Sequence, residues 1–224
     1  MSSPQIIDLN GKDIYFFGDS ITLGVNASIT YSSIVTDAFN GTFVEGNGTV
    51  GFANSGATMM KQNPVNVIGF PNMEDWATPP YTPIYNPLTS GLLFVSFLTN
   101  DVGINLPNYS LANFNTAIDN VVAGLNNAGW PNNRIKFNVR YYLTAQGLDY
   151  TSLIATTPAD ITRYNQFADA LKSKLDGYGI QYFDHWDILS QIPDVETHLD
   201  AEGRHIDNYL HTFVADNIIQ NCTI

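Results

Sequence analysis

Apolar residues along this chain form two patterns, short continuous blocks and longer stripes at helical spacing. The blocks predict strands over 13–18, 92–98, 134–143 and 180–183, with shorter strand pieces at 42–44 and 50–53. The stripes predict helices over 27–39, over 110–129, from the capping sequence at 157–160 to a glycine at 177 or 179, and over 207–219. Strands and helices therefore alternate along the chain.

This alternation predicts the class of fold. Strands separated by helices pair in parallel, because each helix carries the chain back across the sheet. We expect an α/β protein with three layers, α/β/α, doubly wound around a parallel sheet of about five strands. The 224 residues suit one domain, and no internal repeat is visible, so we expect a single domain over 1–224.

The segment 60–90 breaks the pattern. It is rich in proline, has no sustained period and contains Trp76, Tyr81 and Tyr85. Long loops without regular structure are usually binding loops or lids. We expect these three aromatic residues to line a substrate pocket, with a purely structural wrap as the alternative.

Charge and cysteine content exclude several classes of protein. The chain has 9 basic and 21 acidic residues, a formal net charge of -12, which argues against nucleic acid and anionic membranes as partners. Cys222 is the single cysteine, so no intramolecular disulfide or thiol metal site is expected. No signal peptide or transmembrane segment is predicted. The compartment stays open, and the composition is compatible with an extracellular or virion-associated setting.

Four polar positions follow predicted strands or precede the last helix. Ser20 comes after the first strand and Asn100 after the block at 92–98, and parallel strands bring their carboxyl ends to one edge. A serine hydroxyl needs a base to become a nucleophile, and His205 with Glu202 could supply base and orienting carboxylate from one turn. The N–H groups of Ser20 and Gly56 and the Asn100 amide could stabilise a developing oxyanion. The alternative for Ser20, or for Asp19 beside it, is a simple helix cap.

The order of these pieces resembles the SGNH hydrolases, also called GDSL-type esterases. Gly18-Asp19-Ser20-Ile21 is similar to the first family block with its serine nucleophile, and the following blocks are matched by the segments 54–56 and 99–101. Shorter stretches, Tyr164-Asn165 and the segment 182–184, also resemble the family. The resemblance spans about 13–219. It implies the flavodoxin-like SGNH fold, a catalytic triad and an oxyanion hole formed by Ser20, Gly56 and Asn100.

Two departures from the family pattern affect the site. Leu98 replaces the glycine that usually begins the third block. The fifth block usually has aspartate three residues before histidine, and here that position is Glu202, with His205 as the base. Asp200, two residues earlier, is the rival carboxylate, and we expect Glu202.

The resemblance implies hydrolysis of small acyl esters, often acetyl groups on carbohydrate. Lipases, thioesterases and acyltransferases share the same blocks. We therefore expect a serine esterase acting on a small-molecule or oligosaccharide ester, without metal or organic cofactor. The sequence does not indicate the oligomeric state. The rivals are a non-catalytic carbohydrate-binding module using Trp76, Tyr81 and Tyr85, and a nucleotide binder, disfavoured because no glycine-rich phosphate loop follows the first strand.

Overall fold

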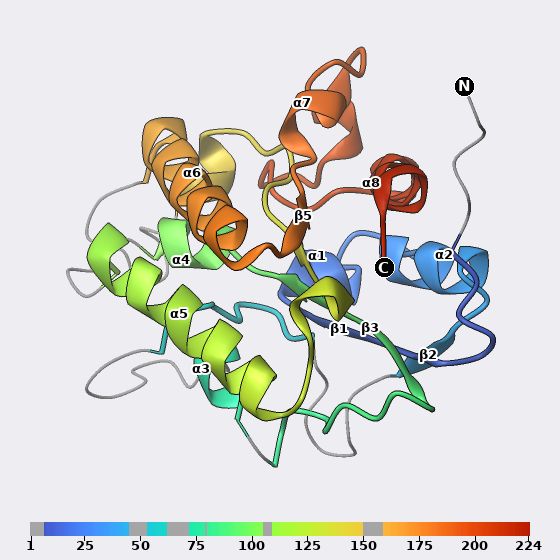
Figure 1. Cartoon of the computed structure of the whole chain (residues 1–224). Coiled ribbons are helices and arrows are strands. Elements are labelled where there is room, and N and C mark those ends of the chain that lie inside the picture. Colours follow the sequence, from blue (N-terminus) through green and yellow to red (C-terminus); the bar gives the residue numbers. More distant parts are fainter. Residues whose placement is uncertain (1–6, 45–52, 62–71, 79, 105–108, 150–158) are drawn as a thin grey trace.

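The computed structural model describes residues 7–44, 53–61, 72–78, 80–104, 109–149 and 159–224 (Figure 1). The strands are β1 (Asp13–Gly18), β2 (Thr42–Val44), β3 (Ser90–Ser96), β4 (Ile135–Asn138) and β5 (Gln181–Phe183). The α-helices are α1 (Ser20–Leu23), α2 (Tyr31–Ala38), α3 (Met73–Trp76), α4 (Thr99–Gly103), α5 (Leu111–Asn127), α6 (Ile161–Tyr178), α7 (Trp186–Leu189) and α8 (Asn208–Asn221). Three short 3-10 helices are η1 (Asn132–Arg134), η2 (Gln146–Leu148) and η3 (Val195–His198).

The strands form one parallel sheet in the order β2-β1-β3-β4-β5. Gly18 pairs with Ser96 across β1 and β3, and Ser96 pairs with Asn138 across β3 and β4. The carboxyl ends of these three strands therefore lie at one level. The predicted α/β fold with a five-stranded parallel sheet is confirmed.

Helices cover both faces of the sheet, as Figure 1 shows with α5 and α6 on one side and α2 and α8 on the other. Alternate residues of β1 serve the two faces: Tyr15 and Phe17 belong to the apolar cluster with α5 and α6, while Ile14 and Phe16 belong to the cluster with α2 and α8. This period of two explains the continuous apolar run in the sequence, because a central strand is buried on both sides.

Several predicted elements differ from the structure in their bounds. The strand expected over 134–143 is the shorter β4, which ends at Asn138, and the strand expected over 92–98 is β3, which ends at Ser96. The helix expected from the capping sequence at 157–160 begins at Ile161, with Asp160 as its N-cap.

The helix expected over 27–39 begins only at Tyr31, because Thr30 caps it and its Oγ1 accepts a hydrogen bond of 3.3 Å from Ser33 N. The loop expected over 60–90 contains α3, which Asn72 caps in the same way. Most of the strand piece expected at 50–53 lies outside the described residues.

A buried histidine joins β4 to the last helix. His185 is fully buried, and its Nε2 lies 3.1 Å from Asn138 Oδ1 while Asn217 Nδ2 lies 3.1 Å from its Nδ1. A neutral ring with the proton on Nε2 satisfies both contacts. Burial lowers the pKa of His185 to about 3.

We expect His185→Gln to be most destabilising at neutral pH. The pKa of His185 in the folded state lies below its unfolded value, so the unfolded chain binds the proton first and stability is lost as pH falls from about 6.5 towards 3. That loss is about 1.4 kcal/mol per pH unit and is absent in the variant. Urea unfolding of both proteins between pH 7.5 and 4 should show the difference shrinking. A constant difference would contradict a buried neutral histidine.

Candidate active site

Ser20 opens α1 directly after β1. Gly18 allows this connection, because a Cβ there would collide with the side chain of Thr22. Asp19 caps the helix, with its Oδ1 accepting a hydrogen bond of 3.0 Å from Ile21 N. The helix cap and the candidate nucleophile are thus neighbouring residues: Asp19 caps the helix, and Ser20 is placed at the carboxyl edge of the sheet.

His205 reaches Ser20 from the segment before α8. Its Nε2 lies 2.8 Å from Ser20 Oγ. The backbone of His205 is held by Asn26, whose Nδ2 donates to the His205 carbonyl at 3.1 Å. Residues far apart in the sequence therefore form a hydroxyl–imidazole pair through which a proton can pass.

Asp200 binds the other side of the imidazole. Its Oδ2 makes a short hydrogen bond with His205 Nδ1, while its Oδ1 accepts from Arg204 N at 2.9 Å and from His205 N at 3.2 Å. Partial burial opposes the charge on Asp200, but these hydrogen bonds outweigh it and lower the pKa of the carboxyl. A carboxylate here favours the proton on Nδ1 and leaves Nε2 to accept from Ser20.

The expected contact between Glu202 and His205 is wrong. Glu202 Oε2 instead pairs with Arg204 Nη1 at 3.3 Å, and 63% of the Glu202 side chain is exposed. The reason is a tight reversal in which Gly203 N donates to Asp200 O and Asp200 N donates to His205 O, both at 2.9 Å. Gly203 has a φ of +71°, which suits glycine. The reversal brings Asp200 to the ring although five residues separate the two.

Asn100 and the loop that carries Gly56 lie side by side. Asn100 is in the first turn of α4, and its Nδ2 donates to Ala57 O at 2.8 Å. Gly56 precedes Ala57 with a φ of +80°, and Asn54 N donates to Gly18 O at 3.1 Å. The loop is therefore tied both to the end of β1 and to α4, which brings the expected oxyanion segments to the edge that carries the serine.

Leu98 changes the core at the family glycine position. Its φ of 170° is extended backbone that any residue adopts. Its side chain is buried in the apolar cluster under α5 and α6. The leucine therefore adds an apolar side chain to this cluster.

Trp76 is a core residue. It is 3% exposed, and its ring lies against those of Phe17 and Phe97 with centroid distances of 6.1 and 6.0 Å. Nothing bound at the surface can stack on it, so the expectation that Trp76 binds substrate is wrong. The reason is that α3 packs closely on α5, where a Cβ on Gly124 would collide with Ala77 O.

Tyr85 also lies away from the serine. Its ring contacts Trp130 at 5.1 Å, and Trp130 contacts Tyr15 at 5.6 Å near the start of β1. Ser20 follows the opposite end of that strand, so the placement of Tyr85 in a pocket with Ser20 is wrong as well. Tyr81 is 44% exposed and stays a prediction.

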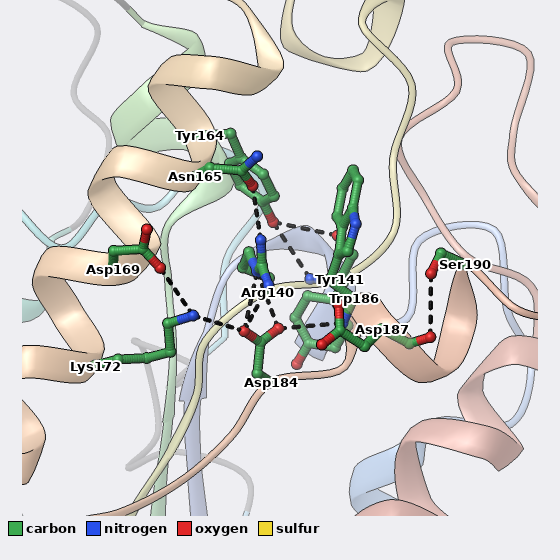
Figure 2. Close-up of polar contacts among 10 residues, drawn as sticks. All are labelled: Arg140, Tyr141, Tyr164, Asn165, Asp169, Lys172, Asp184, Trp186, Asp187 and Ser190. Carbon is green, nitrogen blue, oxygen red and sulfur yellow. Dashed lines mark hydrogen bonds and ion pairs between the residues drawn. The ribbon is translucent and has the colours of Figure 1, made fainter.

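An ion-pair cluster at the carboxyl edge of β4 and β5 was not foreseen from sequence. Arg140, just after β4, binds Asp184 through Nε and Nη2 at 2.8 to 3.1 Å and donates from Nη1 to Asn165 Oδ1 at 2.7 Å (Figure 2). Lys172 Nζ adds a contact of 3.2 Å to Asp184, and the Arg140 guanidinium lies over the Trp186 ring. The two short family-like stretches, which contain Asn165 and Asp184, meet here. They join α6, β4 and β5 at the carboxyl edge.

Comparison with known proteins identifies the class. Residues 14–218 match the model of the GDSL-like Lipase/Acylhydrolase family, so the chain belongs to that family. The protein is thus an ester-cleaving hydrolase with the SGNH fold. No curated protein matches the chain at a significant level.

Solved structures share the fold at low sequence identity. The lipase/acylhydrolase from Enterococcus faecalis superposes with a TM-score of 0.64 at 14% identity, covering 93% of each chain. A carbohydrate acetylesterase family member from Sinorhizobium meliloti gives 0.62 at 14% identity, covering 92% of this chain and 95% of the other. An acetyl xylan esterase gives 0.57 at 15% identity, covering 92% and 97%.

Within the described residues, no three His, Cys, Asp or Glu side chains gather in a group that could hold a metal ion. None of the helices in the described part of the chain has the length and apolar character needed to cross a lipid bilayer.

Proposed function

We propose that this protein is a serine esterase that removes small acyl groups, above all acetyl, from carbohydrate esters, as one domain over 1–224. Ser20 is the nucleophile, His205 the general base and acid, and Asp200 the orienting carboxylate. The observation that carries the proposal is the chain of contacts from Ser20 Oγ to His205 Nε2 at 2.8 Å and from His205 Nδ1 to Asp200 Oδ2.

The reaction follows from this chain of contacts. His205 Nε2 takes the Ser20 hydroxyl proton as Oγ attacks the ester carbonyl, and then gives it to the leaving alcohol as the C–O bond breaks. An acyl-Ser20 intermediate remains. Water, deprotonated by the same nitrogen, attacks this intermediate, and the acid leaves as Ser20 recovers its proton. These steps use no metal or organic cofactor.

The negative charge on the tetrahedral oxygen needs donors in both steps. We assign this role to Ser20 N–H, Gly56 N–H and Asn100 Nδ2. The support is that the Gly56 loop and the Asn100 side chain are joined at the edge that bears Ser20. One such donor commonly contributes about 3 kcal/mol to transition-state stabilisation.

The preference for carbohydrate acetates has two supports. Two proteins of the same fold are described as a carbohydrate acetylesterase family member and an acetyl xylan esterase. The net charge of -12 also favours neutral substrates over anionic ones.

A panel of substrates tests the proposal. p-Nitrophenyl esters from acetate to decanoate, an acyl thioester and acetylated xylo-oligosaccharides would be compared at pH 8 under steady-state conditions. We expect the highest kcat/KM among aryl esters for acetate, and release of acetate from the oligosaccharide. A maximum at long chains would indicate a lipase, a maximum on the thioester a thioesterase, and no turnover of any ester would contradict the proposal.

Tyr81→Ala separates sugar recognition from chemistry. If the exposed ring of Tyr81 stacks on the sugar, kcat/KM for the acetylated oligosaccharide should fall by about 1–2 kcal/mol, or roughly 5- to 30-fold. Turnover of p-nitrophenyl acetate should stay unchanged, because the ring does not touch the acyl group. Trp76→Ala is the contrast: loss of a buried ring should lower the free energy of unfolding by about 3–5 kcal/mol. Equal rates on the oligosaccharide for Tyr81→Ala and wild type would remove Tyr81 from the substrate site.

A further inference from the structure

Asp101 is a fully buried carboxyl group whose two oxygens both bind one loop. Its Oδ2 accepts from Met59 N at 2.8 Å, and its Oδ1 accepts from Met60 N at 2.9 Å. Charge-assisted bonds of this kind are stronger than bonds between neutral groups. The Asp101 side chain therefore links α4 to the loop at 59–60, which lies 41 to 42 residues earlier in the sequence. We call this pair of hydrogen bonds the clamp.

The same turn of α4 holds the loop at another point. Asn100, beside Asp101, donates from Nδ2 to Ala57 O at 2.8 Å. Three hydrogen bonds from two adjacent residues therefore fix the segment 57–60, and Gly56 is the residue directly before it. The direction of the Gly56 N–H depends on where this segment is held.

We propose that Asp101 is a positioning residue of the oxyanion hole, which fixes the 57–60 segment so that Gly56 N–H and Asn100 Nδ2 point at one place. This inference rests on the proposed function. Asp101 acts through the loop and does not touch the substrate.

The geometry favours an ionised carboxyl group. Each oxygen accepts from one N–H donor, so a proton on one oxygen would weaken its bond. An amide NH2 in place of one oxygen would set a donor against a donor. Burial raises the pKa of Asp101 to about 7, helped by the charge of Asp19 and opposed by the N–H groups of Met59 and Met60. At pH 8 the carboxylate is the main form.

Asp101→Asn tests the role with little change in volume. At pH 8 we expect kcat for p-nitrophenyl acetate to fall by about 100-fold, the order found when one oxyanion donor is lost, with KM within threefold of wild type. A trifluoromethyl ketone, which forms a tetrahedral adduct on serine, should bind weaker by the same factor. Hydrogen exchange at the Met59 and Met60 amides should become faster.

Val121→Ala is the matched control. Val121 is a fully buried residue of α5 and belongs to the same apolar cluster as Met59 and Met60. Its truncation therefore lowers stability and leaves the hydrogen bonds of Asp101 in place. Its kcat and its affinity for the ketone should equal those of wild type. Asp101→Ser, which removes the amide NH2, provides a second variant and should give the same loss of kcat.

The outcomes separate this inference from the proposed function. If wild type is active and folded Asp101→Asn has the same kcat, the positioning role alone is overturned. A change in Asp101→Asn that affects only KM would overturn it as well. Failure of both Asp101 variants to fold would assign the residue to stability and overturn the role too. Wild type that neither hydrolyses an ester nor binds the ketone would overturn the proposed function and the positioning role with it.

Discussion

Ser20→Ala is expected to abolish ester hydrolysis while the protein stays folded. The hydroxyl supplies the attacking atom, and without it neither His205 nor the oxyanion donors can form an acyl-enzyme. Losses of about 10⁴-fold or more in kcat are typical when a triad nucleophile is removed. Steady-state hydrolysis of p-nitrophenyl acetate by purified variant and wild type measures this.

Stability should change little in the same variant. The N-cap of α1 is Asp19 and not Ser20, so the helix start is unchanged in the variant. The variant loses one hydrogen bond to His205, worth about 1 kcal/mol. Ser32→Ala is the control and should keep full activity, because it removes a buried hydroxyl in α2 that bonds to Thr30 Oγ1 at 2.7 Å and not to His205. Residual activity above a hundredth of wild type in Ser20→Ala would place the nucleophile elsewhere.

The second large effect concerns the carboxylate. Asp200→Asn should lower kcat by about 10²- to 10⁴-fold, because an amide NH2 opposite Nδ1 favours the tautomer with its proton on Nε2, where it cannot accept from Ser20. The hydrogen bonds that Asp200 accepts from Arg204 N and His205 N make the geometry sensitive to the same change. The kcat of Asp200→Asn and of wild type can be measured with p-nitrophenyl acetate at pH 8.

Glu202→Gln is the matched comparison. Glu202 lies two residues away, carries the same charge and makes an exposed pair with Arg204. Exposed pairs contribute about 0–1 kcal/mol, so kcat should remain within about threefold of wild type. If Glu202→Gln were the damaging change and Asp200→Asn the mild one, the chain of contacts from Ser20 to Asp200 would not be the catalytic one.

Support for the site extends beyond the groups that react. Arg140, at the end of β4, binds Asn165 of α6 and Asp184 at the end of β5, and so links these three elements (Figure 2). The pKa of Asp184 is lowered although burial opposes this, because Arg140 and Lys172 hold its charge. The family-like stretches outside the main blocks therefore contribute to the frame that holds the carboxyl edge.

Sequence was sufficient where the signal is local. The apolar run of β1 and Gly18, which has no room for a Cβ beside Thr22, define the strand and the turn that presents Ser20. The sequence placed the starts of α5 and α8 next to their caps, Ser110 and Asp207, whereas the caps of α2 and α3, Thr30 and Asn72, were not recognised. Alternation of strands and helices then fixes the parallel sheet.

Tertiary packing decided the loop residues. Trp76 and Tyr85 are aromatic residues in a proline-rich segment, which is typical of a binding loop and of a core wrap alike. Only the close approach of α3 to α5 at Gly124 and the contact of Tyr85 with Trp130 assign both rings to packing. The contact that Asp101 makes is likewise not visible in the sequence, although 99–101 matches a family block, because its partners are backbone N–H groups, which no residue type reveals.

The sequence by itself determined the fold and pointed to Ser20, His205 and the segments of Gly56 and Asn100 as the candidate site, because strand periodicity, turn chemistry and block order act over a few residues. Only the tertiary structure decided which carboxylate, Asp200 or Glu202, contacts His205. The reversal that selects Asp200 depends on the loop at η2, where Thr144 N donates to Gly203 O at 2.9 Å. Gly147 allows that approach because it has no Cβ to meet the Gly203 backbone. Spacing alone cannot encode a choice that a distant loop makes through packing.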